Sequence, residues 1–413
     1  MKTAKSAFLL FLCISLLSNT LHSQNNEQKE NKKPAIQFKG FIKSDYWYDS
    51  RQVSASREDI FLFFPLNIKT DASGKDLNAR PSFNYSAVTS RLTGIISGPD
   101  AFGAKTSGVL EADFSGVTNA DINGFRLRHA YGKLRWEKSE LLFGQYWHPM
   151  FVTEVFPNVV SLNTGAPFQP FIRNPQMAYT HYYGNFNLSF TLIAQRDQSN
   201  LGPDGFSPLY MRNTLIPNAH IQLQHKTHQH VWGLAADYKV LQPRVVNALN
   251  EEVNDKIGSW AVMGYYKFSS KSFLASTKTI LGQNLTEHLM MGGYAVQHYD
   301  SLTHLETYTP TNHLNIWGLL AYGEKIRYSL FTGFSKNLGT THVNNGVYYA
   351  RGEDIDYLYR IAPSVSFISG TVQLSTEIEY TVAAYGTPNQ KGLVKNTEEI
   401  GNLRLLFTFF YFF

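Results

Sequence analysis

Hydrophobic and polar residues alternate with a period of two along much of the chain. The segment 371–382, TVQLSTEIEYTV, places its apolar side chains on one face and its polar ones, including Glu377 and Glu379, on the other. The segments 186–195 and 325–334 repeat this pattern. Such alternation predicts β-strands, and about a dozen residues is long for a strand of a globular protein.

Two architectures fit long alternating segments. A soluble β-sandwich has one wet face per sheet, but its strands usually run to about five or six residues. A membrane barrel needs about 9–11 residues per tilted strand, apolar outward and polar inward. Amphipathic helices are almost absent, so we predict an all-β fold, a transmembrane antiparallel up-and-down β-barrel over residues 36–413.

The pattern predicts about sixteen strands, joined alternately by short turns and long polar loops. The predicted strands are 36–48, 83–97, 104–116, 124–136, 140–150, 176–183, 185–196, 218–226, 229–239, 257–268, 271–283, 307–321, 324–337, 356–369, 371–384 and 399–413. This arrangement is typical of an outer-membrane barrel with both chain termini in the periplasm. The count is least constrained around 284–321, where about fourteen or eighteen strands stay open.

The first residues have the layout of a secretory signal peptide. Lys2 and Lys5 precede an apolar run from about Ala7 to Leu17, and small and polar residues follow up to Ser23. A retained anchor is the alternative, but the run falls well short of the roughly twenty residues that span a bilayer. We predict a signal peptide over 1–23 and a short polar periplasmic segment over 24–35.

Charge and cysteine content exclude several functions. The net charge of +5 becomes +3 once Lys2 and Lys5 are removed with the signal peptide, which supports no nucleic-acid partner. The one cysteine, Cys13, also lies in that segment, so the exported chain has neither a disulfide framework nor a thiolate metal site. We expect no cofactor and no metal.

Three stretches resemble a known family. The sequence FRLRHAYGKLRWEKSELLFGQYWHPMF (125–151) is similar to the central strand pair of DcaP-like porins, relatives of the phosphate-selective porin superfamily. RQVSASREDIFLFFP (51–65) and NTGAPFQPFIRNPQMAY (163–179) look like Bacteroidota members of that group. The resemblance implies a homotrimer of sixteen-stranded barrels in the outer-membrane lipid, each passing small hydrophilic solutes by passive diffusion.

Alternation also selects candidate pore-lining residues, because the polar face of each strand points into the lumen. These candidates are Arg91, Glu111, Asp113, Arg126, Arg128, Arg327, Glu377 and Glu379. Interleaved arginines and acids on neighbouring strands could form an ion-pair lattice that only stiffens the wall. They could also form a basic wall that steers anions, and the two interpretations are compatible.

The third long loop, 151–175, is predicted to fold into the barrel and narrow it, as in sixteen-stranded porins. It carries one acid, one base, four prolines and many apolar residues, which suit packing against the lumen wall. Its candidate constriction residues are Glu154, Asn158, Asn163, Gln169 and Arg173. An external loop packed on a neighbour is the alternative, although Asp59–Leu66 in the first loop is a better candidate for a latch between subunits.

Other motifs carry weaker predictions. His225, His228 and His230 cluster near a predicted turn, but a hydrated turn is favoured over a metal site. No G-x-S-x-G or similar motif indicates catalysis, so we predict that the protein is not an enzyme. The alternative to a porin is a substrate-specific outer-membrane transporter or binding barrel, including a hydrophobic-solute type.

The terminal segment NLRLLFTFFYFF (402–413) is predicted to close the barrel against the first strand. Its odd-numbered residues face lipid, with Tyr411 and Phe413 near an aromatic girdle. Phe410 and Phe412 break the alternation of apolar and polar positions. In related porins a terminal aromatic residue is also recognised by the barrel-assembly machinery, which makes Tyr411 and Phe413 a candidate assembly signal.

Deleting Phe413 is expected to leave unassembled protein in the periplasm, because both the seam and the recognition signal lose their last residue. Fractionation followed by gel analysis of folded trimer measures this outcome. A normal yield of trimer would contradict the assignment.

Overall fold

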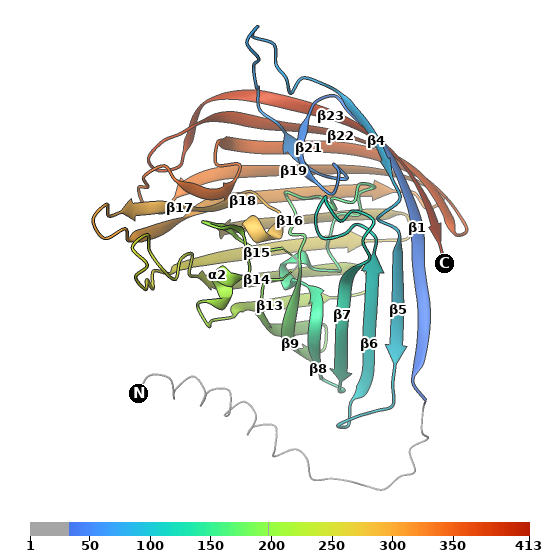
Figure 1. The fold of residues 1–413 in the computed structure, drawn as a ribbon. Helices are drawn as coiled ribbons and strands as arrows, with labels where there is room; N and C mark the ends of the chain where they lie inside the picture. The colour runs from blue at the N-terminus through green and yellow to red at the C-terminus, as the bar shows by residue number, and fades with distance from the viewer. Residues whose placement is uncertain (1–32, 197) are drawn as a thin grey trace, which may run out of the picture.

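The computed structural model describes residues 33–196 and 198–413, so the predicted signal peptide and most of the predicted periplasmic segment lie outside the described residues. Within them, antiparallel strands close one barrel in which β1 (Ala35–Asp49) pairs with β23 (Val394–Phe412) (Figure 1). The short β4 (Ser82–Ser86) and β5 (Arg91–Ser97) pair with successive parts of β1. Together they therefore take the place of one strand in the wall. The described wall thus has sixteen positions, and the predicted fold class is confirmed.

The remaining wall strands follow in chain order around the barrel. They are β6 (Lys105–Asp113), β7 (Arg126–Arg135), β8 (Ser139–Trp147), β9 (Arg173–Tyr183), β10 (Phe186–Ile193), β13 (Asn218–Lys226), β14 (His230–Leu241), β15 (Ile257–Ser269), β16 (Phe273–Gln283), β18 (Glu306–Tyr322), β19 (Ile326–Thr340), β21 (Ile355–Ser369) and β22 (Val372–Pro388). Short turns join them at one end, and most connections at the other end are long. β1 begins and β23 ends at the short-turn end.

Two predicted loops differ from the structure. The segment 284–306 contains β17 (Gly292–Tyr299), which pairs with one end of β18 and with β20 (Tyr348–Arg351) rather than adding to the closed wall. The loop predicted over 385–398 is only the turn 389–393, because β22 and β23 extend further than the apolar pattern indicates.

Smaller elements lie in the connections. They are β2 (Val53–Ser56), β3 (Phe61–Pro65), η2 (Pro149–Phe151), β11 (Leu201–Gly202), β12 (Gly205–Phe206), α2 (Leu209–Arg212) and η3 (Thr286–His288). No helix among the described residues is long and apolar enough to cross a membrane.

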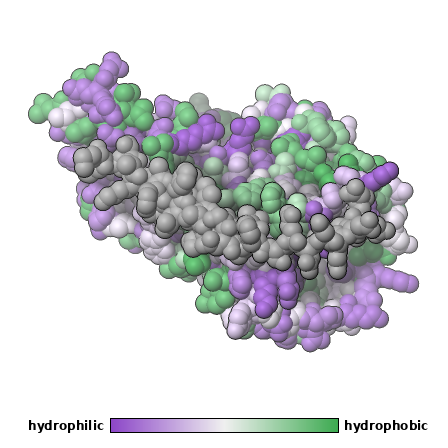
Figure 2. Space-filling view, turned by 90° about the horizontal axis from the view of Figure 1, so that it is seen from below, coloured by the Kyte–Doolittle hydropathy of each residue, from purple (hydrophilic) through white to green (hydrophobic). Residues whose placement is uncertain are grey.

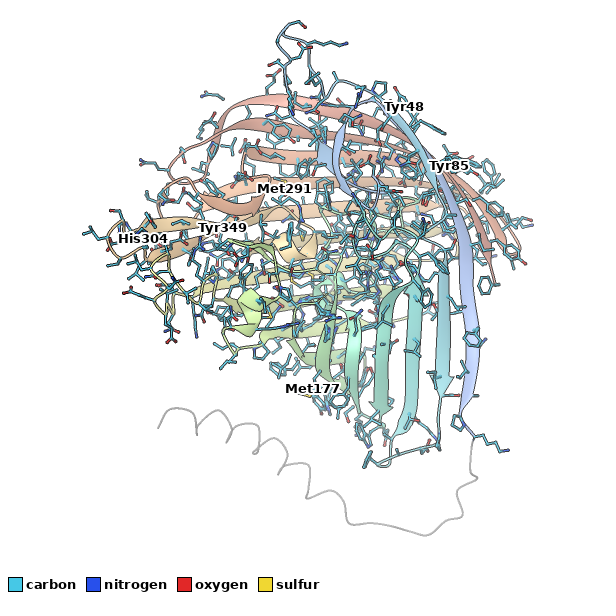
Figure 3. The ribbon with its side chains drawn as sticks, viewed as in Figure 1. Tyr48, Tyr85, Met177, Met291, His304 and Tyr349 are labelled. Carbon is cyan, nitrogen blue, oxygen red and sulfur yellow. The ribbon has the colours of Figure 1, made fainter. Side chains whose placement is uncertain are left out.

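Apolar side chains cover the outer face of the wall. Tyr48 on β1, Tyr85 on β4 and Met177 on β9 are exposed there, whereas Met291 is fully buried (Figure 3). The space-filling view shows hydrophobic patches on the molecular surface beside clusters of hydrophilic residues (Figure 2). This distribution suits a wall in hydrocarbon, where only a closed sheet satisfies every backbone polar group.

The seam explains Phe410 and Phe412, which belong to the inward face of β23. Their rings stack on each other with centroids 5.4 Å apart, and Phe41 of β1 packs edge-on against both. The Lys43 ammonium lies 5.2 Å from the Phe410 ring centroid. The inward face therefore changes from polar to aromatic at the short-turn rim.

Gly40 allows the seam to close tightly. Its N–H donates to the Phe413 carbonyl over 2.9 Å, and the Phe413 N–H donates back to the Gly40 carbonyl over 3.1 Å. A Cβ at residue 40 would lie 2.1 Å from the Arg91 carbonyl oxygen and 2.8 Å from the Phe413 ring. The contact with Arg91 involves backbone, so a side chain would force the strands apart.

We expect Gly40→Ala to destabilise the folded barrel by about 1–3 kcal/mol, the usual cost of overpacking. Loss of heat-resistant folded protein in semi-native gels, as a function of temperature, measures the change. Gly132→Ala is the matched control, because its Cβ would meet only the Ser107 carbonyl, at 3.9 Å. Equal stability of the two variants would argue against a tight seam.

Candidate functional site

The connection between β8 and β9, residues 148–172 and named L3 here, folds into the barrel. The His148 N–H donates to the Ile172 carbonyl over 3.0 Å and so closes the neck of the loop. Val155 and Phe168 are fully buried inside the barrel. Because L3 fills the lumen away from water, its backbone polar groups need partners on the wall.

Cationic side chains of the wall bind carbonyl groups of L3. Lys278 on β16 donates to the Met150 and Phe151 carbonyls over 3.0 and 2.7 Å. Lys43 on β1 donates to the Val160 carbonyl over 3.1 Å. Between these two strands in the wall, Arg360 of β21 donates to the Ala166 carbonyl over 2.9 Å. These bonds hold L3 against the side of the barrel that runs from β16 to β1.

Acidic side chains bind N–H groups of the same loop. The Glu377 carboxylate accepts from the Val160 and Ser161 N–H groups over 2.8 and 3.0 Å. Glu379 accepts from the Asn163 amide over 2.7 Å. All three bonds are buried and have normal hydrogen-bond lengths, so β22 contributes two attachment points of L3.

Four predicted site residues therefore lie beneath or within L3 rather than on an open lumen. Glu377 and Glu379 face inward but are covered by the loop, and Asn163 and Gln169 are fully buried. Gln169 accepts from the Trp317 indole N–H over 2.9 Å. Alternation identified the inward face of β22, but it carries no information on what covers that face.

The first long loop also enters the barrel. Its hairpin, β2 and β3, packs Phe61, Leu62 and Phe63 among buried lumen residues. Arg360 donates to the Leu62 and Phe63 carbonyls over 3.2 and 3.1 Å. The prediction that Asp59–Leu66 forms a latch between subunits is wrong for this hairpin, because its apolar side chains are buried within their own barrel.

A β-bulge in β7 brings two consecutive residues to the lumen. Glu111 of β6 pairs with His129 and Ala112 pairs with Leu127, so Arg128 is the extra residue. A bulge shifts the alternation by one residue. Arg126 and Arg128 face inward before it, whereas the odd-numbered residues face inward after it.

The predicted arginine cluster forms an ion-pair lattice on β5, β6 and β7. Arg126 binds Asp113 through two hydrogen bonds of 3.1 and 2.8 Å. Arg128 bridges Glu111 and Asp113 at 2.8 and 2.7 Å. Arg91 lies 3.6 Å from Glu111. Two acids thus hold three guanidinium groups side by side, which leaves an excess of positive charge.

The inward face of β7 continues with basic residues that the sequence analysis missed. Lys133 binds Glu140 of β8 at 2.9 Å, and Arg135 lies 3.9 Å from the same carboxylate. Strict alternation from Arg126 assigns both to the lipid face, and only the bulge at Arg128 reverses that. Charged residues on a supposed lipid face were the one available signal.

Two small cavities lie on opposite sides of L3. The cavity on the long-loop side has a volume of about 20 Å³ and is lined by Ser56, Arg57, Phe61, Ser115, Arg126, Leu162, Phe171, Arg173, Gln198 and Leu289. The cavity on the short-turn side has about 140 Å³ and is lined by Lys133, Glu140, Leu142, Tyr146, Trp147, Pro149, Gln176, Ala178, Thr180, Ser189, Thr191 and Gln222. Basic side chains of β7 thus border both.

Aromatic residues and arginines separate these cavities. The Trp147 ring stacks on Phe151 at 3.9 Å and meets Phe171 edge-on at 5.0 Å. The guanidinium groups of Arg173 and Arg128 lie 4.9 and 5.8 Å from the Trp147 ring centroid. Arg173, predicted as a loop residue, is the first residue of β9. This group defines the narrow region of the lumen.

The other predicted residues lie towards the short-turn end. Glu154 faces Lys226 at 3.5 Å, and its carbonyl accepts from Lys267 over 2.5 Å. Asn158 is exposed, and Arg327 lies on the inward face of β19. Among the described residues, no group of three or more His, Cys, Asp or Glu side chains could hold a metal ion.

The model of the DcaP outer membrane protein family matches residues 13–232 of the chain. The comparison with curated proteins found no match.

Several solved structures are similar to this chain in fold. The outer-membrane channel DcaP of Acinetobacter baumannii has a TM-score of 0.67 at 15% identity, covering 93% of this chain and 99% of that one. OmpT of Vibrio cholerae has a TM-score of 0.55 at 9% identity, covering 94% and 100%. An anion-selective porin from Comamonas acidovorans has a TM-score of 0.55 at 11% identity, covering 92% and 100%.

Glu377→Ala is expected to release the adjoining segment of L3, because two buried N–H groups lose an acceptor worth about 0.5–1.5 kcal/mol per bond. Hydrogen exchange of the Val160 and Ser161 amides should accelerate about tenfold to hundredfold. Glu398→Ala, at an exposed position of β23, is the control. Unchanged exchange at Val160 and Ser161 would show that the carboxylate does not hold L3.

Proposed function

The chain belongs to the DcaP outer membrane protein family, and from that premise we propose that this outer-membrane porin passes small hydrophilic anions by passive diffusion along the face of β5–β9. The protein is a non-enzymatic channel of the Gram-negative outer membrane. The long-loop end is then extracellular and the short-turn end periplasmic.

One observation carries the anion preference: basic side chains of β7 border the cavities on both sides of L3. Arg126 lines the extracellular cavity, and Lys133 lines the periplasmic one. An anion leaving one cavity therefore meets another cationic group on the far side of the constriction. This continuity supports transfer along the wall rather than trapping at one deep site.

The charge balance of the wall supports the same preference. The basic side chains on the inward face of β5–β9, among the described residues, are Arg91, Lys105, Arg126, Arg128, Lys133, Arg135 and Arg173. The acidic ones are Glu111, Asp113 and Glu140. Seven bases, of which Lys105 is paired with Asp100 in the turn before β6, against three acids in a narrow lumen with low-dielectric walls raise the local concentration of anions.

The aromatic constriction favours a second candidate, a substrate-specific barrel. Beside the arginines lie the aromatic rings of Trp147, Phe151 and Phe171. Small inorganic ions gain no packing energy from aromatic rings. A specific barrel of this kind would give a lower conductance that an added solute blocks, whereas a general porin would show ohmic steps with no such block.

We also propose a homotrimer inserted by the barrel-assembly machinery. One Vibrio cholerae OmpT structure is described as a trimer form. Phe83 and Tyr85, both 69% exposed on the outer face of β4, suit a contact with another barrel. The Bacteroidota assignment rests only on the stretches 51–65 and 163–179.

Reversal potentials in planar bilayers under a KCl gradient test the anion preference. The purified protein is expected to favour chloride, and Arg126→Gln and Lys133→Gln should each lower the chloride-to-potassium permeability ratio about twofold. Lys75→Gln, on the exposed part of the first loop, is the control.

Two outcomes would contradict the proposal. Absence of conductance steps would exclude passive diffusion through a pore. Unchanged permeability ratios in both glutamine variants would reduce the basic wall to a structural role.

A further inference from the structure

Three histidines meet at the neck of L3, and the proposed diffusion function does not use them. They come from three elements: His148 opens L3, His220 lies on β13 and His288 on η3. The His148 ring centroid lies 4.6 Å from that of His288 and 5.9 Å from that of His220. All three side chains are buried.

The first turn of L3 depends on an unprotonated nitrogen of His148. The Met150 N–H donates to His148 Nδ1 over 3.2 Å, so the imidazole caps η2. When His148 is neutral, its proton is therefore on Nε2, which lies 3.7 Å from Asp237. The Asn218 side-chain amide lies 3.2 Å from the same nitrogen, and with Nε2 protonated its otherwise unpartnered oxygen, Oδ1, must be the atom that faces the ring. Protonation of Nδ1 would remove this acceptor. The new N–H of the ring would then face the Met150 N–H, so that two donors meet with no acceptor between them.

The charged groups around His148 already have partners. On β13 and β14, His220 binds Asp237 at 3.1 Å. Lys239 of β14 binds Glu287 of η3, and Glu287 also lies 3.6 Å from His288. Glu287 is thus held by Lys239, and Asp237, 3.7 Å from His148 Nε2, is shared with His220. A proton on His148 would therefore have only this shared acid as counter-charge, against the repulsion of the Lys239 ammonium.

The same cluster holds the other end of L3. The Phe171 N–H donates to the His288 carbonyl over 3.0 Å, and His148 pairs with Ile172 across the neck. The segment after His148 carries Pro149 and Phe151, which border the periplasmic cavity and the Trp147 ring. Movement of this turn would change the narrow region directly.

We propose that His148, His220 and His288 form a proton-operated lock on the neck of L3. When His148 and His288 are neutral, the hydrogen bonds of the neck are intact, which is called the seated state here. A proton on His148 releases the turn 149–151, which then moves into the periplasmic cavity and lowers the current.

The sign of the pH dependence follows from burial. Burial lowers the pKa of His148 and of His288 well below the usual value, whereas a released imidazole titrates near about 6.5. The released state therefore binds more protons, and its population relative to the seated state rises about tenfold per pH unit below about 6.5 for each histidine. The seated state is fully favoured above that pH.

Thiol labelling tests the lock without relying on conductance. Val155 in L3 is fully buried, and the chain's single cysteine, Cys13, can be replaced by alanine. In the Val155→Cys protein, maleimide labelling is compared with and without His148→Asn, since asparagine caps a helix without titrating. Comparison at equal pH cancels the intrinsic pH dependence of the thiol.

At pH 7.5 the two labelling rates should agree within about twofold, and at pH 5.5 the protein with His148 should react about tenfold faster.

In bilayers, closures at pH 5.5 should disappear in His148→Asn and persist in His228→Asn, an exposed control. Equal labelling at both pH values, or closures that persist without His148, would overturn the lock. If His148→Asn does not fold, His288→Asn replaces it under the same criteria. Labelling tests the lock even if the anion preference fails.

Discussion

Hydrogen bonds between charged wall residues and the backbone of L3 are the interaction on which the interior of this barrel depends. Burying an ammonium or carboxylate group costs several kcal/mol unless polar partners replace water. Lys278 finds two L3 carbonyls, and Glu377 finds two L3 N–H groups. The exchange is reciprocal, because a loop inside the lumen also needs partners for its peptide groups. Without these charges the loop could not enter, and without the loop the charges would line a much wider pore.

L3 packs against β1, β16, β21 and β22. The open part of the lumen therefore lies along the inward face of β5–β9. The bulge at Arg128 then determines the chemistry of that face. One extra residue turns Lys133 and Arg135 inward, where strict alternation would place both in lipid. Both residues lie near the short-turn end of β7, where a charge on the lipid side costs up to about 1 kcal/mol. The bulge avoids that cost and extends the row of basic side chains along the lumen.

The neck of L3 joins three parts of the molecule through buried histidines, whereas the Ala166 carbonyl in the middle of the loop is held by Arg360. This difference matters for dynamics. A guanidinium group stays protonated in proteins, but a neutral imidazole that accepts a hydrogen bond can lose that role on protonation. The loop thus combines firm attachments along its length with a titratable one at its base.

The sequence by itself determined the barrel, a count of about sixteen strands with fourteen or eighteen still open, and the β1–β23 seam, because period-two alternation and backbone pairing in lipid are local constraints. It also placed Arg91, Glu111, Asp113, Arg126 and Arg128 in one cluster, since they lie on adjacent strands. Only the tertiary structure decided that Glu377 and Glu379 lie under L3, that the Phe61–Phe64 hairpin enters the lumen, and that three distant histidines meet. Those contacts join residues far apart in sequence across a closed lumen, and alternation gives the direction of a side chain but never what it meets.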